Sequence, residues 1–155
     1  YEEGKPGRSY DSTKKKAVCA VELTEDGKVK RFYTFQILDY SAKSLRKMFE
    51  KHIDKNAKIT TDKWKGYNPI AKDYDLTQIL SDKGSNFKAL HIMIHQIKSW
   101  IRTTYSWVSE NNINRYFDEF CYRINRSQSK DTIFNNLIKR MVKAENICHK
   151  EIVCA

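Results

Sequence analysis

The chain has 155 residues, with 29 Lys and Arg against 19 Asp and Glu, so its formal net charge is +10 at pH 7. This length suits one domain with a single core, and no apolar run reaches the roughly 18 residues of a membrane-spanning helix. The four cysteines form no CxxC pair, which argues against a disulfide framework or a cysteine-based zinc module and favours a reducing cytosol. The charge surplus favours a polyanionic partner, most often nucleic acid; a generally basic protein without such a partner is the alternative.

The first half of the chain predicts strands around one helix. In chain order we expect a loop, a hairpin, a helix and two further strands at residues 1–16, 17–38, 41–53, 59–62 and 76–80. Asp26-Gly27 is a strong signal for the tight turn of the hairpin. Ser41 can cap the helix, whose apolar residues recur at helical spacing. We expect all four strands to share one sheet.

The second half of the chain is helical from Phe87 to about residue 144. One helix begins near Phe87, a second at Ser109 with a regular apolar face, and a third near Thr132. Residues 145–155 are expected to form a tail. Strands, one crossover helix and then further helices predict a single mixed α/β domain over residues 1–155.

A carboxylate stands at the end of the strand 59–62, in the segment "TTDKWKGY". A single acid there is usually a cap or turn former. However, α/β folds place reactive groups at the carboxyl ends of strands, and a carboxylate is a natural ligand for Mg²⁺. Around Asp62, the residues Lys63, Trp64, Lys65 and Tyr67 interleave cations with aromatic rings, a composition common at nucleic-acid contacts.

A polar stripe runs along the helix that begins near Phe87. It comprises Lys88, His91, His95, Lys98 and Arg102, at steps of 3, 4, 3 and 4 residues. Such a row of cations suits an anionic partner lying along it, such as a DNA backbone. A solvated basic face with two ordinary histidines is the alternative. The i, i+4 spacing of the histidines also fits a shared zinc ion, but no glutamate completes an HExxH motif.

The segment "RYFDEFCYRINRS" repeats charges along its helix. Arg115, Glu119 and Arg123 at i, i+4 spacing are most simply a salt-bridge ladder on the helix surface. Arg123, Asn125 and Arg126 at the helix end are alternatively placed to contact phosphates. The full set of candidate nucleic-acid-binding residues is Lys63, Trp64, Lys65, Lys88, Arg102, Tyr105, Arg123 and Arg126.

Three segments of the chain resemble a known family when taken together. "TDKWKGY", "HIMIHQIKSWIRTTYSWVS" and "RYFDEFCYRINRS" look like the catalytic domain of bacterial insertion-sequence transposases of the Merlin-related (ISXO-like) DDE group. The resemblance covers the chain to about residue 144. It implies a ribonuclease-H-like (retroviral-integrase-like) α/β fold, with a mixed sheet and a helical C-terminal half.

The resemblance assigns roles to residues by position. The second catalytic acid of the family opens a Thr-Asp-x-Trp-x-x-Tyr block and falls on Asp62. The third metal-binding residue lies seven positions before a family lysine; that lysine falls on Lys98 and the metal-binding residue on His91. Most relatives have Glu in place of this His, so the chain resembles a DDH version. The implied cofactor is Mg²⁺ or Mn²⁺, held by Asp62 and His91, with Lys98 on a phosphate.

One departure from the family concerns the first catalytic acid. In the family this acid precedes a Tyr that is followed by a glycine-containing turn and a Lys, which match Tyr1, Gly4 and Lys5. The acid and its strand, central to the family's sheet, are therefore expected before residue 1. Glu2 and Glu3 fall in the turn.

The resemblance implies metal-dependent DNA strand cleavage and transfer at insertion-sequence ends. The implied partners are those ends and the target DNA, bound by a homo-oligomer in the bacterial cytoplasm at the nucleoid, without a membrane. A catalytically dead DNA-binding remnant is the alternative, because the first acid is missing. A basic interaction domain with no nucleic-acid role is a further one.

Overall fold

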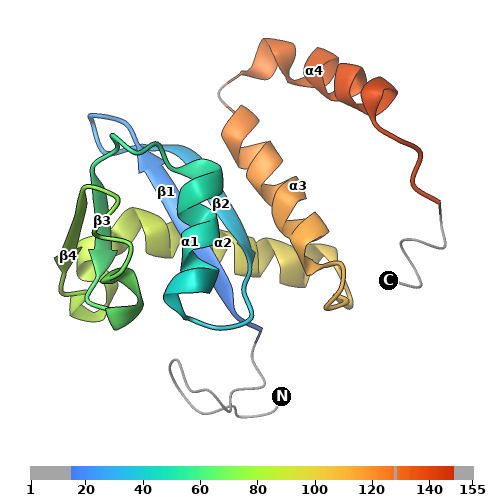
Figure 1. Cartoon of the computed structure of the whole chain (residues 1–155). Helices are drawn as coiled ribbons and strands as arrows, with labels where there is room; N and C mark the ends of the chain where they lie inside the picture. The colour runs from blue at the N-terminus through green and yellow to red at the C-terminus, as the bar shows by residue number, and fades with distance from the viewer. Residues whose placement is uncertain (1–14, 128, 149–155) are drawn as a thin grey trace.

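The computed structural model describes residues 15–127 and 129–148 (Figure 1). It contains four strands, two short 3₁₀ helices and four α-helices. In chain order these are β1 Ala17–Leu23, β2 Val29–Gln36, α1 Ala42–His52, β3 Ile59–Asp62, η1 Lys65–Tyr67, β4 Leu76–Ile79, η2 Asp82–Phe87, α2 Lys88–Thr104, α3 Ile113–Arg126 and α4 Lys130–Lys143. The expected first acid and the residues Tyr1 to Lys5 lie outside the described residues.

The predicted hairpin is confirmed. β1 and β2 pair antiparallel from Ala17 opposite Gln36 to Leu23 opposite Val29. The turn uses Gly27 at φ +77°, a backbone conformation that side chains with a Cβ rarely adopt. Alternate residues of β1 then face opposite sides of the hairpin: Val18 joins the core beneath α1, while Cys19 faces α2 and α3.

The prediction that all four strands share one sheet is wrong for the described residues. β1 and β2 form one two-stranded sheet, and β3 and β4 form a second, parallel one, with Asp62 opposite Ile79. The physical reason is that no strand of the described chain lies between β1 and β3 to bridge them. The mixed α/β class with a helical C-terminal half is confirmed.

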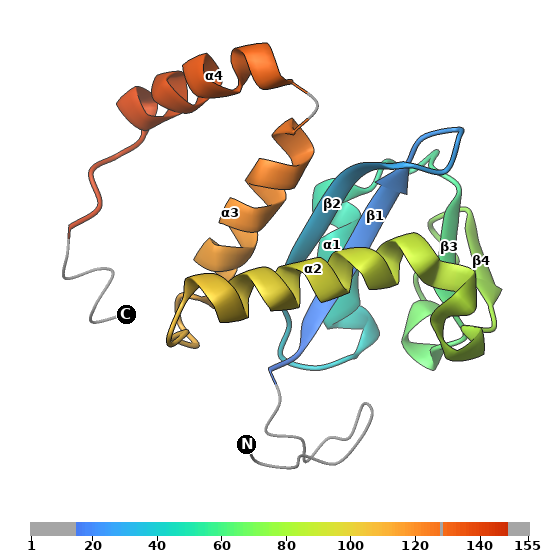
Figure 2. The same cartoon turned by 180° about the vertical axis from the view of Figure 1, so that it is seen from behind.

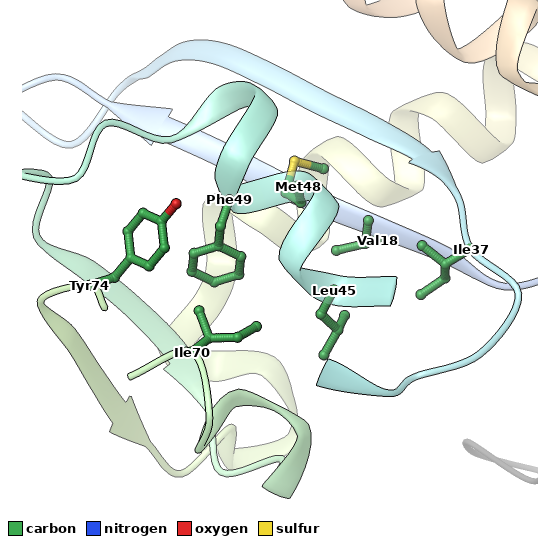
Figure 3. Packing of buried hydrophobic residues seen from close by; sticks show 7 residues of the cluster. All are labelled: Val18, Ile37, Leu45, Met48, Phe49, Ile70 and Tyr74. Atoms are coloured by element: carbon green, nitrogen blue, oxygen red, sulfur yellow. The ribbon is translucent and has the colours of Figure 1, made fainter. Parts of the chain in front are cut away.

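One core lies where α1 covers the hairpin and meets the segment after β3 (Figure 3). Ser41 caps α1 as predicted, accepting a hydrogen bond from the Ser44 amide at 3.3 Å. The helix then buries one stripe at i, i+3, i+4 spacing. The buried residues of this core are Val18, Ile37, Leu45, Met48, Phe49, Ile70 and Tyr74.

A second core forms on the opposite face of the hairpin, against α2 and α3 (Figure 2). Phe32 of β2 is fully buried there and meets Phe120 of α3 edge to face at 6.0 Å. The side-chain amide of Asn125 binds both backbone groups of Phe32, accepting from its N–H at 2.7 Å and donating to its carbonyl at 3.0 Å. Asn114 accepts from the Gln36 amide at 2.8 Å. α3 therefore closes the outer edge of β2, as a further strand would.

Two helix boundaries differ from the sequence expectation. α3 begins at Ile113 rather than Ser109, because the segment before it turns at Asn112, which is buried. α4 begins at Lys130, two residues before Thr132. Cys19 and Cys121 are free thiols, and Cys154 lies outside the described residues. None of the helices formed by the described residues is both long and apolar enough to span a bilayer.

Candidate active site

Asp62 closes β3 and is held by local hydrogen bonds. Its carboxylate accepts from the Trp64 amide at 3.3 Å, the turn-forming role expected of an acid after a strand. Gln78 of β4 donates to the carbonyls of Asp62 at 3.4 Å and Trp64 at 3.1 Å. β4 therefore holds the backbone that follows Asp62 in place. The half-buried Asp62 carboxylate is positioned as a result.

Trp64 braces the end of this strand from the side. Its indole N–H donates to the Tyr40 carbonyl at 2.9 Å, and the two rings meet edge to face at 6.4 Å. A Cβ at Gly66 would lie 2.6 Å from the indole nitrogen and 2.8 Å from that carbonyl, so only glycine leaves room for this bond. Tyr67 packs against Phe49 of α1. The two aromatic residues thus support the strand end, and Lys63 and Lys65 beside them are exposed.

His91 stands in the first turns of α2 and packs against Gly84. A Cβ at Gly84 would lie 2.8 Å from the imidazole Nε2. Gly84 has φ +95°, and the two preceding residues, Asp82 and Lys83, also have positive φ, at 45° and 52°. Backbone strain of this kind concentrates at functional sites. The turn "SDKG" therefore brings the backbone at Gly84 into packing contact with the His91 ring.

Asp62 and His91 line one pocket of about 350 Å³, although they belong to different elements. Its walls come from the facing edges of β1 and β3, from Trp64 and Tyr67, and from the start of α2. Thr61 contributes a buried hydroxyl oxygen that has no hydrogen-bond partner among the described residues. Two of the three residues to which the resemblance assigns roles, Asp62 and His91, therefore line the same pocket.

Lys98 and Arg102 line a second pocket of about 390 Å³ farther along α2, together with Lys15. Four residues, Ala17, Cys19, Tyr40 and Ile94, line both pockets, so the two adjoin along β1. Burial raises the pKa of the Cys19 thiol, while its hydrogen bond with Thr34 and then the charge of Lys98 lower that pKa to a smaller extent. We call the two adjoining pockets the β1–α2 trough; its ends carry Asp62 with His91, and Lys98 with Arg102.

The other predicted nucleic-acid contacts are dispersed. Lys88 and His95 are exposed on α2, and neither lines the trough. Arg126 is half-buried at the end of α3. Beside α2, Tyr105 donates to Glu119 at 2.8 Å. The nucleic-acid roles of these residues stay predictions.

Arg123 forms the ion pair that its spacing predicted. Its guanidinium binds one Glu119 oxygen through two nitrogens, at 2.7 and 3.0 Å. The hydrogen bond from Tyr105 and then that from Arg123 lower the pKa of Glu119. Burial and the bond to Glu119 raise the pKa of Tyr105. This cluster links the end of α2 to α3.

The described residues supply only some of the ligands that the expected metal ion needs. Among the described residues, no group of three or more His, Cys, Asp or Glu side chains is arranged to hold a metal ion. Mg²⁺ takes one or two carboxylates and completes its shell with water and substrate phosphate, so Asp62 fits as one ligand. His91 fits as a nitrogen ligand at the same pocket.

Sequence reasoning missed Gly84 and Gln78, and it offered Asn125 as a phosphate contact, whereas the Asn125 amide binds the backbone of Phe32. The string "SDKG" before a helix carried a detectable signal, because its glycine permits positive φ. Gln78 and Asn125 act through partners 14 to 93 residues away in sequence, a separation that periodicity does not register.

The pocket with Asp62 and His91 adjoins a pocket lined by cations, an arrangement suited to binding a phosphate beside a divalent metal ion. The comparison with protein families agrees: the model of the ISXO2-like transposase domain matches residues 2–125, so the chain belongs to this family. It is an insertion-sequence transposase domain, and that membership implies DNA as its partner. Neither the curated proteins nor the solved structures contain a match.

Proposed function

We propose that this domain performs metal-dependent strand cleavage and transfer on the DNA ends of an insertion sequence. Asp62 and His91 bind the divalent metal ion, while Lys98 and Arg102 bind the DNA backbone. One observation carries this proposal: side chains from the end of β3 and the start of α2 line a single pocket, and that pocket adjoins the one lined by the two cations.

Each side chain has a separate role in this proposal. A bound Mg²⁺ or Mn²⁺ supplies activation of a water or 3′-hydroxyl and stabilises the leaving oxygen. Asp62 contributes a carboxylate oxygen whose direction the Trp64 amide helps to fix. His91 contributes a neutral imidazole nitrogen, which suits Mn²⁺ better than the harder Mg²⁺. Lys98 neutralises a phosphate as a point charge.

We further propose that the complete sheet is ribonuclease-H-like, with one more strand seated between β1 and β3. This arrangement is supported by the pocket that both strands line, and by the Thr61 hydroxyl, which has no hydrogen-bond partner within residues 15–127 and 129–148. In a protein extended upstream of Tyr1, backbone amides on the facing edges of β1 and β3 should gain protection from hydrogen exchange. Unchanged exchange at both edges would remove this part of the proposal.

Metal binding is tested without any activity. Addition of Mn²⁺ to the chain should broaden the NMR signals of residues around Asp62 and His91, because the ion is paramagnetic. Asp62→Ala should abolish this broadening, while Asp75→Ala, an exposed acid before β4, should leave it unchanged. Equal broadening in both variants would exclude Asp62 as a ligand.

A second candidate function is a DNA-binding remnant without catalysis. It is favoured by the absence, among residues 15–127 and 129–148, of a third acidic or imidazole ligand near the pair. An upstream-extended protein separates the two functions. If it cleaves end-sequence DNA in Mg²⁺ and its Asp62→Ala variant does not, the domain is an enzyme. If neither cleaves but both bind DNA, the remnant is correct.

A further inference from the structure

Trp107 is a large apolar side chain exposed on the loop that joins α2 to α3. This loop comprises residues 105–112, and Trp107 is 77% exposed, whereas Trp64 and Trp100 are half-buried. Indole rings are highly buried on average, because their apolar surface is large. A single exposed apolar residue is ordinary on a protein surface. The meaning of Trp107 therefore depends on how firmly the loop holds it and on which groups surround it.

Contacts on both sides of Trp107 hold the loop in place. On one side, the Tyr105 hydroxyl donates to the Glu119 carboxylate at 2.8 Å. On the other side, Val108 packs against the second core, and Asn112 at the end of the loop is buried. The indole thus projects into solvent from a backbone that is anchored before and after it. A partner that binds the indole has little loop motion to restrict, which lowers the entropic cost of binding.

The loop lies at the cation end of the β1–α2 trough. Arg102, in the last turn of α2, and Ile113, the first residue of α3, both line the pocket that Lys98 lines. Both views show the gold loop at the end of α2 that lies away from β3, the strand of Asp62 (Figures 1 and 2). Trp107 follows Arg102 by five residues, so their Cα atoms are at most about 18 Å apart. The exposed indole therefore stands within a short reach of two cations that suit phosphate.

We propose that Trp107 stacks on an unpaired nucleobase of the DNA strand whose phosphates lie along the trough. This inference rests on the proposed function, because Lys98 and Arg102 hold that strand. A nucleobase fits the position because every base has a π face on which an indole can stack, and the nearby cations neutralise the phosphates that accompany it. The base is unpaired, because inside a duplex its faces are covered by neighbouring bases. At about 3.4 Å per nucleotide, it lies at most about five nucleotides beyond the phosphate at Arg102, on the side away from Asp62.

Fluorescence anisotropy of the whole chain with a labelled single-stranded oligonucleotide tests the stacking. Trp107→Ala should weaken binding about 5- to 150-fold, the loss typical of one stacked base, and Trp107→Phe should retain most of the affinity. The slope of log K against log salt should stay unchanged in Trp107→Ala, since no phosphate contact is lost. The matched control is Phe134→Ala, which removes an exposed aromatic ring from α4 and should leave the affinity unchanged. Unchanged affinity in Trp107→Ala, an equal loss in Phe134→Ala or a flatter salt slope overturns the proposal.

An oligonucleotide of the same length built from abasic nucleotides tests whether the indole contacts a base. It keeps the phosphates and offers no π face, so the unchanged chain and Trp107→Ala should bind it equally. If Trp107→Ala still weakens binding to the abasic strand, the indole does not act by stacking and the proposal is wrong. Absence of any salt-dependent binding of either oligonucleotide to the unchanged chain would overturn the DNA contacts of the proposed function as well. Base-containing DNA that binds through Lys98 but is insensitive to Trp107→Ala overturns the stacking alone.

Discussion

Gly84→Ala tests how the turn before α2 positions His91. At φ +95° an alanine costs about 1–2 kcal/mol in backbone strain. Its methyl group would also lie 2.8 Å from the imidazole Nε2. The ring is the exposed end of a side chain, so it should rotate away instead of forcing the backbone to move. We therefore expect a modest loss of stability together with a displaced His91.

Gly27→Ala is the matched control for this effect. Gly27 has φ +77°, and an added Cβ would meet nothing within 4 Å. Urea denaturation should therefore give both variants a similar loss of about 1–2 kcal/mol. Only Gly84→Ala should also change the imidazole NMR shifts of His91 and weaken Mn²⁺ binding. If His91 shifts and Mn²⁺ affinity are unchanged in Gly84→Ala, the glycine does not position the imidazole.

Three further predictions concern DNA binding, acid stability and the edge of β2. Lys98→Ala should weaken DNA binding and flatten the slope of log K against log salt by about 0.9, measured by fluorescence anisotropy; an unchanged slope would exclude a phosphate contact. Hydrogen bonds from Ser41 and Ser44 lower the pKa of Asp39 to about 2, so its stabilising contribution is complete above about pH 4 and is lost as the pH falls toward 2. Acid titration of Asp39→Asn should lack this loss, and identical acid curves would contradict it. Asn125→Ala leaves two backbone groups of buried Phe32 without their partner and should cost about 1–3 kcal/mol for each group that stays dry, measured by urea denaturation; a loss under about 0.5 kcal/mol would mean that water replaces the amide.

Local patterns predicted the elements but not how the strands join. The hairpin followed from Asp26-Gly27 and the start of α1 from Ser41, because turn and cap chemistry act within a few residues. The division into two sheets did not follow, because pairing between β1 and β3 depends on what lies between them. No periodic pattern within either strand carries that information.

The sequence could single out individual residues of the candidate site, but it could not predict how they are arranged in space. The spacing of α2 correctly gave an exposed polar stripe, although Met93, one of its two buried residues, was missed. The sequence could not show that His91 and Lys98 line different pockets, since this depends on how α2 crosses β1. The sequence also could not show that the indole N–H of Trp64 donates a hydrogen bond to the carbonyl of Tyr40, a residue 24 positions earlier.

The separation of His91 and Lys98 along α2 divides the proposed work between the two ends of the β1–α2 trough. Seven residues at about 1.5 Å each place them about 10.5 Å apart along the helix axis. DNA advances about 3.4 Å per nucleotide of one strand along its axis, so this interval corresponds to about three nucleotides. In the proposed function, Lys98 would then bind a phosphate about three nucleotides from the cleaved one, while Asp62 and His91 act at the cleaved one. Because the two ends use different residues, DNA affinity and metal affinity should vary independently in this domain.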